Sequence, residues 1–295
     1  GVLALFLSLR LFFDVGVPQP YEGYQAFVSM ESSVEPTTLR ESSLEDLVDN
    51  PGNPEGSRLD AVLSRATLRV GYFSDSLPFV FRNDSDQLVG FEVDLAHLFA
   101  SELGVELEFV RLPREDIASQ LTSGLVDMVM AGLLVTPERG RRVAFSRSYF
   151  EATLALIVSD HLRDGYDSSE ELRSLQQPRI AMLDVPYFER FVTRYLPNLE
   201  LDTIATPRDF FRAEAGVFDA LLMSAEAGSA WTLVYPQYSV VVPQPTMVSA
   251  PVAIALPQEA AALKSYLDAW LELQERAGVI DRLFNHWILG EGARA

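Results

Sequence analysis

Apolar and polar residues alternate along the chain with two different periods from about residue 67 onward. Leu68–Tyr72, Val105–Arg111 and Val126–Met130 have the short apolar or alternating pattern of buried strands. Between them, Asp94–Leu103 and Asp116–Thr122 repeat apolar residues at helical spacing, and a glycine closes each helix. This β-α-β-α-β order predicts a largely parallel, doubly wound sheet, whose ligand crevice lies at the carboxyl ends of the strands.

A second series of strands and helices follows, so the pattern predicts two α/β lobes. The last stretch, Glu259–Trp287, is strongly helical, with apolar residues at the spacing of a face that packs on the core. The strands of the second series are expected at Ala152–Val158, Arg179–Met182, Leu199–Ile204 and Ala220–Met223.

The first 66 residues have a different pattern. Residues 1–20 begin with an apolar run that is too short for a membrane span of roughly 20 apolar residues. Three interpretations of this stub compete: the end of a transmembrane helix, which we favour, a signal-peptide remnant, or an ordinary buried helix. Residues 21–66 are polar and acidic with several prolines and glycines, and they predict a linker that ends in a short lead-in helix, Arg58–Arg65.

Composition narrows the function classes. The chain carries 42 acidic and 23 basic side chains, a formal net charge of −19. This charge argues against nucleic acid as a partner, because phosphate binding depends on Lys and Arg. The sequence contains no cysteine, which excludes disulfides, iron–sulfur clusters and cysteine nucleophiles. His97, His161 and His286 are far apart in the sequence, so we expect neither a metal site nor another cofactor.

Two blocks of sequence resemble a known family. Leu68–Val110 contains the string GFEVDL, and Leu121–Phe150 contains an SG-x-VD turn, a TPER motif and an FS-x-x-Y ending. In this order and spacing, the chain resembles the bacterial extracellular solute-binding proteins of family 3, the amino-acid-type periplasmic proteins. The resemblance implies a type II periplasmic binding protein fold, an α/β fold with two doubly wound mixed sheets. It also implies two hinge strands, at Ala152–Val158 and Val248–Leu256.

The resemblance also sets the expected boundaries and surroundings of the lobes. Residues 67–157 plus 253–292 are expected as lobe 1, and residues 158–252 as lobe 2. The segment Ala225–Pro245 is similar to a subgroup in which this domain is fused behind a sodium:dicarboxylate symporter, which would also account for the apolar stub. These features imply a periplasmic or extracytoplasmic domain that is tethered to the membrane through its N-terminal segment and serves a membrane transporter.

In this family the solute lies between the lobes. The resemblance implies that Arg139, the Arg of the TPER motif, grips a ligand carboxylate, since a guanidinium matches a carboxylate with two hydrogen bonds. The alternative is a salt bridge within its own loop. Backbone groups of Ala131 and Gly132 would line the same pocket. Further cleft candidates, of which the aromatic ones fit a core position equally well, are Tyr72, Phe73, Asp184 and Tyr187.

The chain departs from the family pattern at several ligand positions. Leu134 replaces a hydroxyl residue, Ser76 replaces the aromatic that stacks on the ligand, and Ser224 replaces the Asp that receives the ligand ammonium. Arg114 stands where an aromatic is usual and adds a second guanidinium, unless it faces solvent on its loop. Val185–Pro186 takes the place of an anion-binding Gly-Thr loop. Loss of the ammonium acceptor and gain of an arginine favour a dicarboxylate over an amino acid.

The sequence therefore predicts a domain that captures a small organic anion, a dicarboxylate or an amino acid, by closure of its lobes. Two alternatives stay open. One is a degenerate sensor domain that binds no solute. The other is an enzyme of the cyclohexadienyl dehydratase type on the same fold, with Glu226 as a general acid. Because no base or nucleophile accompanies Glu226 in the sequence, we expect no enzymatic activity.

Overall fold

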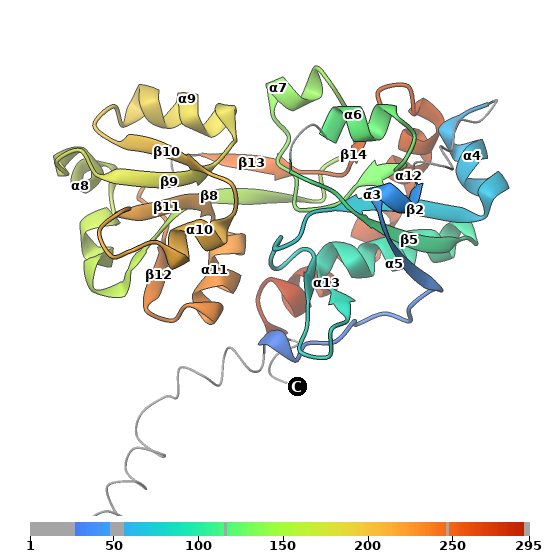
Figure 1. Ribbon diagram of the computed structural model, residues 1–295, viewed down its shortest axis with the longest axis horizontal. Coiled ribbons are helices and arrows are strands. Elements are labelled where there is room, and N and C mark those ends of the chain that lie inside the picture. The colour runs from blue at the N-terminus through green and yellow to red at the C-terminus, as the bar shows by residue number, and fades with distance from the viewer. Residues whose placement is uncertain (1–26, 48–55, 115–116, 246–247, 292–295) are drawn as a thin grey trace, which may run out of the picture.

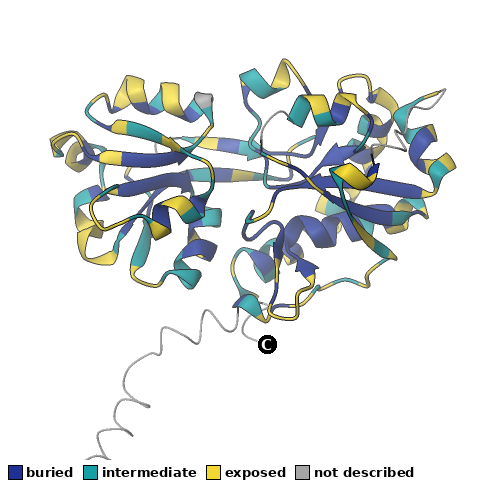
Figure 2. Ribbon diagram, in the orientation of Figure 1, coloured by how far each residue is buried: buried dark blue, intermediate teal, exposed yellow. Residues whose placement is uncertain are grey.

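Two twisted sheets, one in each lobe, organise the chain (Figure 1). The computed structural model describes residues 27–47, 56–114, 117–245 and 248–291. The strands are mostly buried, whereas the outer faces of the helices are exposed (Figure 2). Helices cover the sheets, so the central strands are buried on both faces and have near-continuous apolar sequences.

Lobe 1 contains a six-stranded sheet with the order β1-β5-β2-β6-β14-β7. The first four strands of this order are parallel, and β14 is antiparallel to both β6 and β7. A separate two-stranded hairpin, β3–β4, precedes the first long helix. The strands are β1 Leu39–Ser43, β2 Thr67–Tyr72, β3 Phe81–Arg82, β4 Leu88–Val89, β5 Glu106–Arg111, β6 Met128–Val129, β7 Ala144–Phe145 and β14 Ala255–Leu256.

The helices of lobe 1 begin and end largely as the sequence predicts. The lead-in helix α4 spans the expected residues, and α5 ends at Gly104, whose φ of +66° suits a glycine at a helix C-terminus. However, α5 begins at Phe91, earlier than Asp94, the expected first residue. The helices are α3 Leu44–Leu47, α4 Arg58–Arg65, α5 Phe91–Leu103, α6 Ile117–Thr122, α7 Pro137–Gly140, α12 Ala261–Arg276 and α13 Val279–Trp287.

Lobe 2 contains a sheet with the order β10-β9-β11-β8-β12. The strands β10, β9 and β11 are parallel, and β8 is antiparallel to both β11 and β12. The strands are β8 Phe150–Ser159, β9 Arg179–Leu183, β10 Glu200–Ile204, β11 Ala220–Ser224, β12 Tyr238–Val241 and β13 Ser249–Val252. The helices are the 3-10 helix η1 Asp160–Tyr166, α8 Ser169–Ser174, α9 Pro186–Tyr195, α10 Pro207–Arg212 and α11 Ala225–Val234.

Two strands, β8 and β13, cross from one lobe to the other (Figure 1). They pair antiparallel over Phe150–Thr153 of β8, and β8 then continues into the lobe 2 sheet, where Leu154–Val158 pair with β11. Directly after β13, β14 returns to the lobe 1 sheet. The structure therefore confirms the two-lobed fold with two hinge strands, and it places Leu154–Val158 in the sheet of lobe 2.

Residues 27–47, which the sequence assigns to a linker, pack onto lobe 1. Phe27 and Met30 are buried in the core, and the Phe27 ring stacks on Phe81 with centroids 4.9 Å apart. The strand β1 extends the sheet at its edge by pairing with β5. The prediction of a linker with little core of its own is therefore wrong for these residues. Their polar sequence hides a strand whose hydrogen-bonding partner lies far along the chain.

The expected apolar stub, residues 1–20, lies outside the described residues, as does the first part of the expected linker. Within the described part of the chain, no helix combines the length and the apolar character needed to cross a membrane. Tethering through the N-terminal segment therefore stays a prediction.

Candidate functional site

The candidate site is a cavity of about 110 Å³ between the two lobes. Its walls come from residues that follow β2, β5 and β6 of lobe 1, from residues at and after β9, β10 and β11 of lobe 2, and from the hinge strands. Open α/β sheets bind ligands at the carboxyl ends of their strands. The cavity therefore lies where the predicted topology places a ligand site.

Six of the residues predicted from the sequence line this cavity. They come from four different loops or helix ends, which only the fold brings together. Ser224 comes from lobe 2, whereas the other five come from lobe 1. The six are Ser76, Arg114, Ala131, Gly132, Leu134 and Ser224.

Arg114 provides the positive charge at the cavity. Its Nη2 donates to the carbonyl oxygens of Ser74 and Asp75 and to Ser76 Oγ, at 3.2, 3.3 and 3.4 Å. The guanidinium also lies over the Phe73 ring, 5.1 Å from its centroid. Burial lowers the pKa of Arg114, the carboxylate of Asp75 raises it, and the charge of Arg139 lowers it. Arg114 thus faces the cavity instead of solvent and lies within the electrostatic reach of a second arginine.

Arg139 is positioned by its own loop and does not line the cavity. Thr136 caps the short helix α7, and Arg139 Nη1 donates to the carbonyl oxygen of Leu134 at 3.0 Å. Burial lowers the pKa of Arg139, whereas the carboxylates of Asp184 and Glu138 raise it. Its guanidinium therefore supports the loop that forms one wall of the cavity.

Two ion pairs join the lobes beside the cavity. Arg208 at the start of α10 donates from Nε and Nη2 to the two carboxylate oxygens of Asp75, at 2.8 and 2.6 Å. Arg190 of α9 pairs with Glu138 of α7. Each pair is partly exposed and contributes about 0–1 kcal/mol, somewhat more for the two-bonded Asp75–Arg208 pair. Both pairs link residues of different lobes, so they favour the closed arrangement.

A buried carboxylate fixes the loop that carries Ala131 and Gly132. Glu92 is fully buried in α5, accepts a hydrogen bond from Gly132 N at 2.6 Å, and accepts another from the Tyr149 hydroxyl. Desolvation by burial raises the pKa of Glu92 to about 7, and the two hydrogen bonds oppose this shift. On its other side, the loop is held to the hinge, since Ala253 N donates to the Leu133 carbonyl at 3.0 Å.

Gly132 cannot be replaced without disturbing the cavity. Its φ is +65°, and a Cβ would lie 2.4 Å from the ring of Phe79, which lines the cavity. We expect Gly132→Ala to lower the free energy of unfolding by about 1–3 kcal/mol, because it combines overpacking with an unfavourable backbone conformation. Urea denaturation followed by circular dichroism measures the change.

Gly140→Ala is the matched control for this substitution. Gly140 ends α7, has no positive φ, and has no atom within 4 Å of the position of a Cβ. We expect its free energy of unfolding to stay within about 1 kcal/mol of the original or to rise. Equal stability of the two variants would show that Phe79 gives way easily and that Gly132 is not needed to shape the cavity.

The remaining predicted residues do not line the interlobe cavity. Tyr72 lines a neighbouring cavity of about 550 Å³, and Phe73 is buried beneath Arg114. Tyr187 packs on Phe188, with ring centroids 5.8 Å apart. Asp184 is exposed, and its charge raises the pKa of Arg139. The aromatic candidates thus adopt the packing role that the sequence left open for them.

Several cavity residues were not predicted. Most are apolar, and a sequence pattern reads such residues as core. Pro207, next to Arg208, could have been found, because it follows a strand of the second lobe at its carboxyl end. The principal unpredicted residues are Asp75, Leu77, Phe79, Met182, Phe188, Met223 and Trp231.

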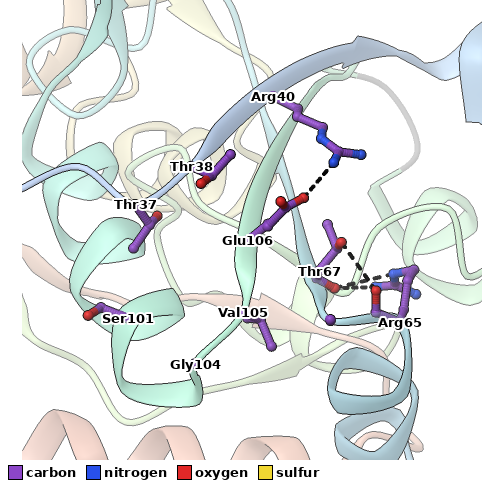
Figure 3. A pocket seen from close by; sticks show the side chains of 10 residues that line it. Thr37, Thr38, Arg40, Arg65, Thr67, Ser101, Gly104, Val105 and Glu106 are labelled. Carbon is purple, nitrogen blue, oxygen red and sulfur yellow. Dashed lines mark hydrogen bonds and ion pairs between the residues drawn. The ribbon is translucent and has the colours of Figure 1, made fainter.

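Another cavity, of about 660 Å³, lies elsewhere, beside β1 and the end of α5 (Figure 3). Thr67 and Glu106, which begin β2 and β5, line it, so it lies at the opposite end of the parallel strands from a ligand crevice. An ion pair between Arg40 and Glu106, 2.7 Å long, lies in it (Figure 3). Among the described residues, no cluster of three or more His, Asp or Glu side chains could hold a metal ion.

Glu226, the general acid of the enzyme alternative, lies in the first turn of α11. Both carboxylate oxygens are within 3.3 Å of Thr153 N in the hinge strand β8. Burial raises the pKa of Glu226, and its hydrogen bonds oppose the shift. The side chain does not line the cavity, so in this arrangement it fastens α11 to the hinge.

Fold and candidate site together define a class of protein: a two-lobed α/β protein with a cavity between its lobes. Residues 68–290 match the family model of the bacterial extracellular solute-binding proteins, family 3, and the chain belongs to this family. The family resemblance read from the sequence is thereby confirmed. Membership also implies a location outside the cytoplasm.

Relatives of known type cover most of the chain. The chain is 28% identical over 240 residues to a cyclohexadienyl dehydratase of Pseudomonas aeruginosa, covering 79% of this chain and 86% of that protein. It is 34% identical over 90 residues to the arginine-binding extracellular protein ArtP of Bacillus subtilis, covering 30% of this chain and 35% of that protein. The crystal structure of the ancestral amino acid-binding protein AncCDT-1 superposes with a TM-score of 0.70 and 30% identity, covering 79% of this chain and all of that one.

The match to a cyclohexadienyl dehydratase corrects one prediction. The sequence led us to expect no enzymatic activity, because Glu226 has no partner base. A relative that aligns over 86% of its own length is nevertheless an enzyme. The solved relative AncCDT-1 is described both as an amino acid-binding protein and as a precursor of cyclohexadienyl dehydratase. This family and fold therefore include binding proteins and enzymes, and the exclusion of catalysis does not stand.

Proposed function

We propose that this chain captures a small organic anion between its lobes and presents it to a membrane transporter outside the cytoplasmic membrane. The observation that carries the proposal is the guanidinium of Arg114 at the interlobe cavity. Arg139 lies close enough for its charge to lower the pKa of Arg114. A carboxylate bound beside these two like charges would relieve their repulsion and bond the guanidinium.

Lobe closure supplies the mechanism. Only β8 and β13 join the two lobe sheets in the described part of the chain, so the lobes can rotate about them as a hinge. The Asp75–Arg208 and Glu138–Arg190 pairs form across the cleft in the closed form. A solute that touches both lobes binds this form and increases its population. The transporter then takes the solute when the lobes open; a transporter fused to the N-terminal segment is one arrangement of this kind.

A thermal-shift screen of the full chain tests the proposal. The solutes are arginine, histidine, glutamine, succinate, malate, glutarate and the monocarboxylate 4-methylpentanoate, each over a range of concentrations. We expect at least one organic anion or amino acid to raise Tm progressively with concentration, because it binds only the folded state. Arg114→Gln is expected to weaken binding of that solute at least tenfold, because it removes the charged partner of the carboxylate.

Two further arginine variants locate the anion site. Arg139→Gln is expected to weaken binding as well, through its loop and its charge. Arg141→Gln, an exposed arginine two residues further on, is the control and should leave binding unchanged. If Arg114→Gln binds like the original chain, the assignment of Arg114 is wrong. If no solute raises Tm, the proposal fails, and a sensor domain that binds no solute is favoured instead. If the chain turns over a cyclohexadienyl substrate, it is an enzyme and the proposal of solute capture is wrong.

A further inference from the structure

The walls of the interlobe cavity are more apolar than an amino acid or a dicarboxylate requires. Lobe 2 contributes the side chains of Met182, Phe188, Met223 and Trp231, and lobe 1 contributes those of Leu77 and Phe79. Phe188 and Trp231 are at most 5% exposed. A solute enclosed here therefore exchanges water for hydrocarbon over most of its surface.

The acidic groups around the cavity are already engaged. Both carboxylate oxygens of Asp75 are bonded to Arg208, and Glu92 Oε2 is bonded to Gly132 N. Ser224 Oγ caps α11 by accepting from Ala227 N at 3.2 Å. An α-ammonium group bound in this cavity would lose its water without gaining a carboxylate, which strongly disfavours binding.

Arg114 is the one cationic residue among the described residues that line the cavity. The hydrogen bonds of Arg114 to described residues leave from Nη2 and are 3.2 to 3.4 Å long, so the rest of its guanidinium fork can bond one carboxylate. The guanidinium of Arg208 lies over the Trp231 ring, 5.3 Å from its centroid, but it is already bonded to both oxygens of Asp75. A second carboxylate beside Met182 and Trp231 would have to compete with Asp75 for this cation. Burying a charge against apolar side chains is costly, so a dicarboxylate fits poorly.

The volume of the cavity further limits which solutes fit into it. On the scale at which roughly 10–15 Å³ holds one water, a cavity of about 110 Å³ has room for on the order of seven to eleven non-hydrogen atoms. This range includes branched-chain carboxylic and 2-oxo acids such as 4-methylpentanoate and 4-methyl-2-oxopentanoate. Arginine has slightly more non-hydrogen atoms than this range allows.

We infer that the solute is a monocarboxylate with a branched or aromatic apolar body and no ammonium group, its carboxylate bonded to Arg114 and its body enclosed by lobe 2. The inference rests on the proposed capture of an organic anion and narrows it. It replaces the dicarboxylate that the sequence favours, because the second arginine, Arg139, holds the carbonyl of Leu134 instead of facing the cavity.

Calorimetric titration of the full chain with matched solutes tests the inference. The probes are 4-methylpentanoate, leucine, which is the same chain with an added ammonium, the neutral amide 4-methylpentanamide, and glutarate. We expect 4-methylpentanoate to bind about 100-fold more tightly than leucine or the amide. Leucine must bury its ammonium without a carboxylate partner, and the amide lacks the charge that bonds Arg114. Glutarate is expected to bind no more tightly than leucine.

Ser224→Asp supplies the missing acceptor and should reverse the preference. Asp is as good an N-cap as Ser, so α11 keeps its start. We expect the variant to bind leucine at least tenfold more tightly than the original chain and 4-methylpentanoate more weakly. Ser229→Asp adds the same charge at an exposed position of the same helix and should change neither affinity.

The outcomes separate the inference from the proposed function. If arginine, histidine, leucine or glutarate binds more tightly than 4-methylpentanoate, the monocarboxylate inference is overturned while solute capture stands. If none of the probes and none of the screened solutes binds, the proposed function itself fails. A Ser224→Asp variant that folds but binds leucine no better would show that Ser224 does not face the solute.

Discussion

Asp94→Ala is expected to lower the free energy of unfolding by roughly 3–5 kcal/mol, because Asp94 joins three distant parts of the chain. Its carboxylate is fully buried and accepts from Ser32 Oγ, Ser33 N and Ser33 Oγ at 2.6, 2.9 and 2.6 Å. It also accepts from the buried indole Nε1 of Trp287 in α13, at 2.9 Å. Removing the acceptor leaves the indole donor buried without a partner and releases the N-terminal segment from α5.

Urea denaturation measures the loss, and trypsin reports where it occurs. Arg40 is exposed in β1, so a loosened segment should be cut there faster than in the original chain. Asp94→Asn keeps an oxygen acceptor and should cost less than Asp94→Ala. Glu102→Ala, at an exposed position of the same helix, is the control and should stay within about 0.5 kcal/mol. A change of less than 1 kcal/mol for Asp94→Ala, with Arg40 equally protected, would contradict the prediction.

The N-terminal segment shows where sequence reasoning is weakest. Its sequence has no apolar period and therefore predicts a linker. However, the hydroxyls of Ser32 and Ser33 donate hydrogen bonds to the carboxylate of Asp94, some 60 positions away. Thr37 likewise bonds His97 Nδ1 through its backbone N–H, at 3.2 Å. Hydrogen bonds between polar side chains leave no periodic trace in the sequence. Phe27, Met30 and Leu47 are buried, but the apolar residues of the segment follow neither a strand nor a helix period, so they predict no element.

The main body of the fold was predictable because its strands are buried on both faces. Leu68–Tyr72 is apolar except for Arg69 and forms most of β2, and Gly104 ends α5 as predicted. The hinge was predicted from the family motifs and not from periodicity, since β8 has the same apolar pattern as any other buried strand. Periodicity thus predicted the elements, and the motifs predicted how they connect.

The candidate site was predicted less completely, and for a physical reason. Which way an arginine points depends on its loop: Arg139 turns back to its own backbone, and Arg114 turns into the cavity. Trp231 and Phe79 were indistinguishable from core residues, because a closed cleft is itself lined by buried apolar side chains. The charged partner of Asp75, Arg208, carries no motif, since a Pro-Arg pair after a strand is a common helix start.

Glu92→Gln is expected to remove about 3 kcal/mol of pH dependence from the stability of the protein. Desolvation raises the pKa of Glu92 from 4.5 to about 7. Between these values the folded state holds the proton more tightly than the unfolded chain. The free energy of unfolding therefore falls as the pH rises through this interval, by about 1.4 kcal/mol per unit. The contribution is fully present below pH 4.5 and lost above pH 7.

The amide of Gln carries no charge to desolvate and can keep both contacts. Its oxygen can accept from Gly132 N while its NH₂ donates to the Tyr149 hydroxyl oxygen. The difference in free energy of unfolding between Glu92→Gln and the original chain should therefore grow in favour of Gln by about 3 kcal/mol from pH 4.5 to 8. Urea denaturation at a series of pH values measures it, and Glu102→Gln on the same helix should give a flat difference.

Tyr149→Phe tests what sets the pKa of Glu92 by removing a hydrogen bond that opposes the effect of burial. The hydroxyl of Tyr149 lowers the pKa of Glu92 by bonding its ionised form, so its loss should move the midpoint above pH 7. If Glu92 of the original chain titrates with a midpoint near pH 4.5, water reaches its carboxyl group and burial does not raise its pKa. Because Glu92 bonds Gly132 N directly, the same titration changes the charge behind the cavity wall. An anion bound near Arg114 would be repelled by the ionised form, so capture should weaken as the pH rises through 7, where the loss of stability is nearly complete.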